Sequence, residues 1–323
     1  MLHLRMIVPP DRTRAAADLI ESTVGTAHLV VLPGAARDPA GDVVLCDVAR
    51  EAGDELLREL RGLGIDRDGS IAVQSIDLSL SERADAAERE APGEAADAVL
   101  WEQLTEATHE ESTLSVTYCA FMVLATMLAA CGVVLDNAIL IVGAMAVGPE
   151  FGPLAGVCTA AVRRAPRLAA RSLLALFVGF AVAIAATTLF SLAMDALDLF
   201  SRAQLEAERP NTRFVWQPDP FSFVVALLAG AAGTLSLTSA KSGALVGVAI
   251  SVTTVPAGAN AAVALAYGDL AQMAGSLEQL ALNLFGIVLA GTATLYAQRA
   301  LWDTQRGRWR RPSHKGKGKG KAG

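Results

Sequence analysis

Hydrophobic and polar positions divide the chain at about residue 113. Before that point, short apolar runs follow one another with the periods of strand, helix, strand, strand, helix and strand. We expect strands over residues 2–8, 27–32, 42–48 and 70–80, and helices over residues 11–24 and 51–63. The helical period places Ala15, Leu19, Ile20 and Val24 on one buried face of the first helix. This βαββαβ order predicts an α+β, ferredoxin-like domain over residues 1–80, with both helices on one face of an antiparallel sheet.

Residues 81–112 are rich in Ala and Glu and contain Pro92-Gly93. We expect a polar helical connector whose last turn brings Glu106, His109, Glu110 and Glu111 close to the membrane. Residues 299–323 are dominated by Lys, Arg and Gly, which is typical of a basic, disordered tail.

The remaining part, residues 113–298, contains six apolar segments that are each long enough for a hydrocarbon core of roughly 30 Å. Four are plain, and two are interrupted by Pro and Gly. Plain, broken and plain segments follow one another twice, which predicts an α-helical polytopic domain built as a 3+3 inverted repeat. The expected segments are 113–135, 137–162 (broken), 168–197, 220–240, 242–266 (broken) and 274–298.

The two breaks fall at Pro149–Pro153 and Thr253–Gly258. Irregular backbone at bilayer depth is tolerated only where protein covers it or where it lines a wet cavity. Matched breaks in two halves therefore indicate a substrate or ion site. The candidate site residues are Asn137, Pro149, Glu150, Gly152, Pro153, Thr253, Thr254, Pro256 and Asn260.

Glu150 is the sharpest candidate, because an ionisable side chain within a membrane segment is a functional-site hypothesis by default. It could bind a cation or carry a proton, with carbonyl groups freed by the break as further ligands. The alternative is a shallow Glu150 that reaches water or pairs with Arg163 or Arg164. Asn and Thr at the breaks could equally form ordinary interhelical hydrogen bonds.

Charge distribution suggests an orientation. Residues 1–110 hold 10 Arg and 22 Asp or Glu, which argues against nucleic acid or anionic lipid as partners of this part. Met1–Pro9 does not resemble a secretory signal, so we expect a cytoplasmic front domain. The positive-inside rule then places both termini in the cytoplasm of a multi-pass inner-membrane protein, because the strongly basic segments fall on one side. They are Arg163–Arg171, Lys241 and the tail from Arg299.

The 198–220 loop is expected on the opposite side. Its three Arg are offset by four acidic residues, and its aromatic residues Phe200, Phe214 and Trp216 suit an interfacial belt.

Candidate chemistry is sparse. Four cysteines occur without a CxxC pair, and HExxH, GxSxG and nucleotide-binding GxxxxGK[ST] motifs do not occur. We therefore expect no metal, no cofactor and no enzyme. The favoured hypothesis is a secondary transporter or channel for an ion or small solute, with a regulatory or oligomerisation domain in the cytoplasm. The alternative is a membrane-anchored signalling or scaffold protein whose front domain senses a small ligand. Expected partners are the lipid bilayer, the ion or solute, and further copies of the chain in a homo-oligomer.

Two stretches carry a resemblance to a known family. The first, Ser115–Gly156, includes Leu135-Asp136-Asn137-Ala138 and Gly148-Pro149-Glu150-Phe151-Gly152-Pro153. The second includes Lys241-Ser242-Gly243-Ala244 and Val255-Pro256. Together they resemble the prokaryotic conserved hydrophobic family called domain of unknown function 389 (DUF389), over about residues 112–298. The resemblance implies a bacterial or archaeal multi-pass inner-membrane protein and supplies no substrate. The family commonly has an uncharged residue at the position of Glu150, so a role for this carboxylate is a hypothesis about this chain.

Overall fold

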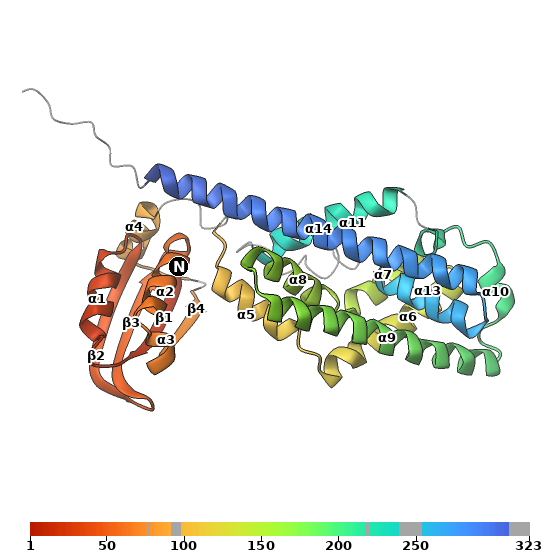
Figure 1. The fold of residues 1–323 in the computed structure, drawn as a ribbon, viewed down its shortest axis with the longest axis horizontal. Coiled ribbons are helices and arrows are strands. Elements are labelled where there is room, and N and C mark those ends of the chain that lie inside the picture. Colours follow the sequence, from red (N-terminus) through yellow and green to blue (C-terminus); the bar gives the residue numbers. More distant parts are fainter. Residues whose placement is uncertain (77, 92–97, 218–219, 239–253, 310–323) are drawn as a thin grey trace, which may run out of the picture. The chain divides into compact units, whose positions relative to one another are not determined.

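The computed structural model describes residues 1–76, 78–91, 98–217, 220–238 and 254–309, with side chains to residue 302. The chain forms two compact units (Figure 1). One is Met1–Leu100 together with Gln298–Gly323, and the other is Trp101–Ala297.

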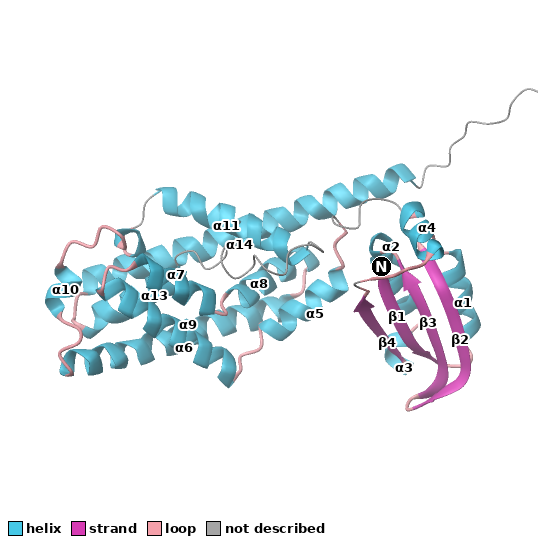
Figure 2. Cartoon of the chain, turned by 180° about the vertical axis from the view of Figure 1, so that it is seen from behind, coloured by secondary structure: helices cyan, strands magenta, loops and turns pink. Residues whose placement is uncertain are grey.

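The first unit contains a four-stranded antiparallel sheet with the strand order β2-β3-β1-β4 (Figure 2). The chain order confirms the expected βαββαβ pattern, with one additional short helix, α3, before the last strand. The elements are β1 (Leu2–Val8), α1 (Thr13–Ser22), β2 (Thr26–Arg37), β3 (Ala40–Val48), α2 (Arg50–Gly62), α3 (Ile65–Asp68) and β4 (Ser70–Ser75), followed by α4 (Glu82–Glu90).

One hydrophobic core joins the sheet to both long helices. Strand β1 alternates as a half-buried strand should, and its buried residues Leu2, Leu4, Met6 and Val8 share one face. Ile20 of α1 and Leu56 of α2 belong to the same cluster of buried side chains. Both helices therefore cover the same face of the sheet.

Several expected boundaries were wrong. The first helix ends at Ser22, so Val24 is exposed, and Ala16 rather than Ala15 enters the core. The last strand ends at Ser75 instead of continuing to residue 80.

The β2–β3 hairpin is longer than expected because β2 continues through Pro33 and Gly34. An irregularity in the pairing between Leu32 and Ala36 accommodates these residues. The Asp42 carboxylate holds this region by accepting hydrogen bonds from Gly34 N at 2.8 Å and Thr13 Oγ1 at 2.6 Å. These bonds lower the pKa of Asp42, with that of Thr13 contributing most.

The second unit is a helical membrane region. Four of its described helices are long and apolar enough to span a bilayer, and a bent pair makes a fifth candidate. The four are α6 (Val116–Val134), α9 (Pro166–Ala196), α11 (Pro220–Thr238) and α14 (Leu270–Trp309, candidate span to Trp302). The pair is α7 (Ala138–Val147) with α8 (Phe151–Arg163), bent by 56°. The protein is thus a multi-span membrane protein with four to five candidate spans among the described residues.

The second expected broken segment is described only in its second half. Helix α13 (Thr254–Ala266) is a short apolar helix, whereas residues 239–253, including Lys241 and Thr253, lie outside the described residues. Nearly every residue of α13 is buried. A helix that is apolar on all sides belongs in a protein interior or a membrane.

The prolines do not interrupt helices where we expected. Pro153 is the third residue of α8 and Pro256 is the third residue of α13. The first N–H groups of a helix have no intrahelical acceptor, so proline costs little there. The first break therefore lies at Gly148–Glu150, before Pro153, and α13 continues through Pro256 and Gly258.

Short helices mark the two ends of this unit in Figure 1. Helix α5 (Trp101–Glu111) lies at one end, and α10 (Arg202–Glu206) lies at the other. Helix α5 packs antiparallel to α8, because Arg163 Nη2 donates to Glu102 Oε1 at 2.8 Å at one end and Glu111 packs against Gly152 at the other. The 3-10 helix η2 (Arg213–Val215) belongs to the loop that carries α10.

We expect the Cys46 thiol to be unreactive in the folded protein. It is fully buried on β3, and burial raises its pKa to about 12, so the reactive thiolate is scarce at neutral pH. Maleimide labelling mapped by peptide mass spectrometry should modify Cys46 only after denaturation. Ser75→Cys, on the exposed end of β4, is the matched control and should react at once. Rapid labelling of native Cys46 would contradict this packing.

Candidate functional site

The buried carboxylate of Glu150 lies where two short helices begin. Glu150 is the N-cap residue of α8, and its Oε1 accepts a hydrogen bond from Thr254 Oγ1 at 2.8 Å. Thr254 is the first residue of α13, which is 104 positions away in the sequence. Glu150 is only 1% exposed, so protein surrounds this meeting point. Two breaks that are distant in the sequence therefore meet through one hydrogen bond.

The start of α8 favours negative charge at this position. Its first N–H groups lack intrahelical acceptors, and the helix dipole adds about half a positive charge at its N-terminus. Glu150 Oε2 has no hydrogen-bond partner among the described residues. One carboxylate oxygen thus remains for a proton or for a ligand.

Glycine at position 148 makes room for this carboxylate. A Cβ atom at Gly148 would overlap Glu150 Oε2 and would lie 2.8 Å from Val255 Cγ2. The side chain of Glu150 therefore folds back over the end of α7 instead of pointing away from it. The close approach of α7, α8 and α13 depends on this glycine.

Tyr118 and Glu111 lie around the same site. Tyr118, on α6, interacts electrostatically with Glu150, and its hydroxyl has no hydrogen-bond partner in the part of the chain that the structure describes. Glu111 packs against Gly152 in the first turn of α8 and remains accessible to solvent. Partial burial raises the pKa of Glu111, and Glu110 adds to this shift. An accessible carboxylate thus lies beside the helix that begins at the buried one.

The structure brings only part of the expected site together. Pro149 lies in the break, Gly152 and Pro153 form the first turn of α8, and Thr254 and Pro256 form that of α13. Asn137 instead caps the other end of α7, where Oδ1 accepts from Ile139 N and Leu140 N. Ten helical residues, about 15 Å, separate that cap from the break.

The shallow alternative for Glu150 is wrong. Arg163 pairs with Glu102, Arg164 is exposed, and Glu150 is buried with Thr254 as its hydrogen-bond donor.

A second polar cluster surrounds Arg209. In the sequence, Arg209 is only one of three arginines in the 198–220 loop, whose charges are offset by four acidic residues. Its side chain is buried, with 6% exposed. Arg209 Nη1 donates to Asn260 Oδ1 at 3.0 Å, and Nη2 donates to Gln272 Oε1 at 2.9 Å. Asn260 Nδ2 also donates to Ser276 Oγ at 2.7 Å. Asn260 therefore belongs to this cluster and not to the Glu150 site. No local motif marks Arg209, because its partners are distant in the sequence.

The same loop is attached to the first half of the unit through Asp136, between α6 and α7. Asp136 Oδ2 accepts from Asn211 Nδ2 at 2.9 Å, and Oδ1 accepts from Thr212 Oγ1 at 2.9 Å. Phe200, which was expected in an interfacial belt, is instead buried, and its ring packs edge-on against Phe190 at 5.9 Å. The loop is thus packed onto the helices.

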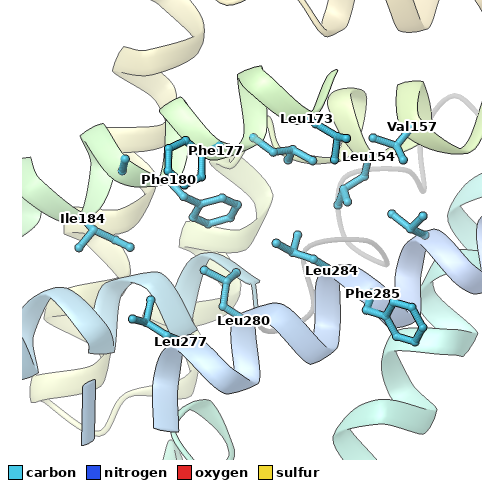
Figure 3. Close-up of a pocket in the computed structure, with 13 residues that line it drawn as sticks. Leu154, Val157, Leu173, Phe177, Phe180, Ile184, Leu277, Leu280, Leu284 and Phe285 are labelled. Carbon is cyan, nitrogen blue, oxygen red and sulfur yellow. The ribbon is translucent and has the colours of Figure 1, made fainter. Parts of the chain in front are cut away.

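An apolar cavity of about 570 Å³ lies elsewhere in the unit (Figure 3). Its walls are hydrocarbon side chains of α8, α9 and α14, so it offers an ion no polar ligands. The lining residues are Leu154, Val157, Leu173, Leu176, Phe177, Phe180, Ala181, Ile184, Leu277, Leu280, Leu284, Phe285 and Val288.

Comparison with protein families places most of these elements in one domain. Residues 145–289 match the family described as "Domain of unknown function (DUF389)". The protein contains a DUF389 domain. No curated protein and no solved structure matches the chain. The DUF389 match includes Glu150, Thr254 and Arg209, whereas Tyr118 and Asp136 precede it.

The Thr254 hydroxyl should stabilise the meeting of α8 and α13. Thr254→Val keeps the shape of the side chain but removes the donor to Glu150, leaving a buried acceptor unpaired. We expect a loss of about 1–3 kcal/mol of stability. Thermal unfolding in detergent should show a lower Tm for Thr254→Val and a near-wild-type Tm for Thr254→Ser. Equal Tm values for all three proteins would mean that this bond contributes nothing.

Proposed function

We propose that this protein moves an ion or small solute across the membrane and that Glu150 exchanges protons during the cycle. The observation that carries the proposal is the fully buried carboxylate at the start of α8, which accepts a hydrogen bond from Thr254 of α13. Ionisable groups inside membrane proteins are costly and are retained mainly on ion, proton or substrate pathways. Convergent ends of discontinuous helices are the recurring architecture of such sites in secondary transporters.

We further propose that the membrane domain is a 3+3 inverted repeat with six spans. In this arrangement, α6, the α7–α8 pair and α9 belong to one half, and α11, α13 and α14 belong to the other. Two features support it: α8 and α13 are both short, and each carries proline near the beginning of its described residues, at Pro153 and Pro256.

The proposed orientation places α5 and Arg163–Arg171 on the cytoplasmic side. Arg171 Nη1 lies 2.8 Å from His109 Nε2, and Ser172 Oγ donates to Ser112 Oγ at 2.9 Å. Asp136 and the 198–217 loop lie on the periplasmic side in this arrangement. Such a segregation agrees with the rule that basic residues concentrate in cytoplasmic loops.

Proton exchange fits Glu150 better than binding of a metal cation. A proton needs only one free carboxylate oxygen, such as the unpaired Oε2 of Glu150, whereas a metal cation needs several ligands. Glu111, which is accessible and packs on the first turn of α8, is the proposed donor or acceptor on the cytoplasmic side. Loss of charge at Glu150 would weaken its attraction to both helix starts, which provides a way to couple protonation to movement of α8 and α13.

Topology can be tested independently of transport. In a cysteine-free background, Ala165→Cys and Glu208→Cys should react from opposite sides of the membrane, with residue 208 accessible from the periplasm. Impermeant maleimide added to intact cells and to inverted vesicles provides the measurement. Labelling of both positions from the periplasm would exclude the proposed orientation.

Glu150→Gln should abolish the pH dependence of flux while leaving the fold intact. The amide keeps the size of the side chain and can accept the Thr254 hydrogen bond, but it cannot exchange a proton. Purified protein reconstituted into liposomes should be compared over pH 5–8 with a pH-sensitive dye inside the vesicles and a panel of inorganic and carboxylate ions outside.

Glu106→Gln is the matched control, because Glu106 is an exposed carboxylate on α5. It should retain wild-type flux and pH dependence. Identical profiles for wild type and Glu150→Gln would reject the proton role. Absence of flux in every protein would favour the alternative, a membrane-anchored signalling or scaffold protein.

A further inference from the structure

Arg209 is a buried cation without an ion-pair partner among the described residues. Its guanidinium group is bound by the neutral side chains of Asn260 and Gln272. Burying a charge costs free energy when no opposite charge is in contact with it. Hydrogen bonds to neutral amides or hydroxyl groups offset only part of this cost. Within the described residues, the buried guanidinium group therefore lacks an opposite charge in contact with it.

Neither Asp136 nor Asp269 supplies this contact, and Asp219 lies outside the described residues. Both oxygens of Asp136 accept hydrogen bonds from Asn211 and Thr212. Asp269 Oδ1 accepts from Gln272 N at 3.0 Å, which caps the start of α14. Both carboxylates raise the pKa of Arg209 at longer range, but burial dominates and lowers it.

Glu206 and Glu208, in the same loop, do not complete the site either. Glu206 pairs with Arg202 at 2.6 Å, and Glu208 is exposed beside the buried Arg209.

Two buried donors adjoin one another at this position. Arg209 Nε and Trp216 Nε1 both lack a hydrogen-bond acceptor within the described ranges. The guanidinium carbon lies over the Trp216 ring, 5.9 Å from its centroid, which is within cation–π distance. Buried N–H groups normally have a hydrogen-bond acceptor. Two N–H groups without one, beside a positive charge, favour binding of a negatively charged acceptor.

The backbone holds these donors in place. The carbonyl oxygen of Trp216 lies against α14, where a Cβ atom at Gly275 would come within 2.7 Å of it. Asn211 and Thr212 attach the intervening segment to Asp136. The segment is also shallow, because Glu208 and Pro210 on either side of Arg209 are exposed. Arg209 therefore lies close to the surface of the helical unit.

We infer that Arg209 and Trp216 form a binding site for a small oxyanion, such as a carboxylate or phosphate, at the end of the helical unit that carries the 198–217 loop. One oxygen accepts from Arg209 Nε and Trp216 Nε1, and the positive charge of the guanidinium balances the anion. Asn260 and Gln272 hold the guanidinium in position and do not contact the anion. This site goes beyond the proposed function, and binding to it does not require transport.

Thermal unfolding of the full-length protein in lipid nanodiscs tests this inference without a flux measurement. Sodium acetate and sodium phosphate are titrated separately, because a ligand that binds only the folded state raises Tm with a saturable dependence on concentration. Arg213→Gln is the matched control, since Arg213 is an exposed arginine of the same loop whose Nε donates to Gln217. Wild type and this control should show the same saturable rise.

Trp216→Phe separates binding from folding. Phenylalanine keeps an aromatic ring over Arg209 but removes the indole N–H, and loss of one hydrogen bond should shift the midpoint to about tenfold higher anion concentration. Arg209→Gln should remove the saturable rise. If Arg209→Gln does not fold, Trp216→Phe still decides the question. A linear response shared by all variants, or an unchanged midpoint in Trp216→Phe, would overturn the inference.

Discussion

Satisfying polar groups away from water is the constraint on which this membrane domain depends. A bilayer core provides no partners for free N–H and C=O groups, so a broken helix must end inside protein. The chain meets this requirement by burying α13 and placing the starts of α8 and α13 at the Glu150 carboxylate. Small residues permit this arrangement, since a side chain at Gly148 would occupy the space of that carboxylate. The break is therefore a junction in which the Thr254 hydroxyl of α13 donates a hydrogen bond to the carboxylate at the start of α8.

Helix α13 connects two polar sites of opposite charge. Thr254, at its first position, binds Glu150, and Asn260, six residues later, binds Arg209. Six residues correspond to about 9 Å along the helix axis, which is too far for the two charges to form an ion pair. Both contacts come from one buried helix, so a shift of α13 along its axis would disturb them together. This common element is the physical basis for coupling between the two sites.

The sequence predicted the elements better than their ends. Alternation in Leu2–Val8 and long apolar runs were sufficient for the front sheet and the plain spans, because periodicity and length are local properties. Pro153 and Pro256 were assigned to breaks, although proline is equally compatible with a first helical turn. Glu150 could be recognised as a charge at membrane depth. Arg209 could not, because its burial results from contacts with residues more than 50 positions away.

Charge balance links the two proposals. An ionised Glu150 and a charged Arg209 are opposite charges buried at separate positions. The free-energy cost of removing each charge from water is therefore not offset by the other. A proton on Glu150 and an oxyanion beside Arg209 neutralise both places at once. Helix α13 contacts both side chains, so any effect of one ligand on the affinity of the other would be reciprocal. Together the two proposals describe joint binding of a proton and an anion, which requires no direct contact between the two ligands.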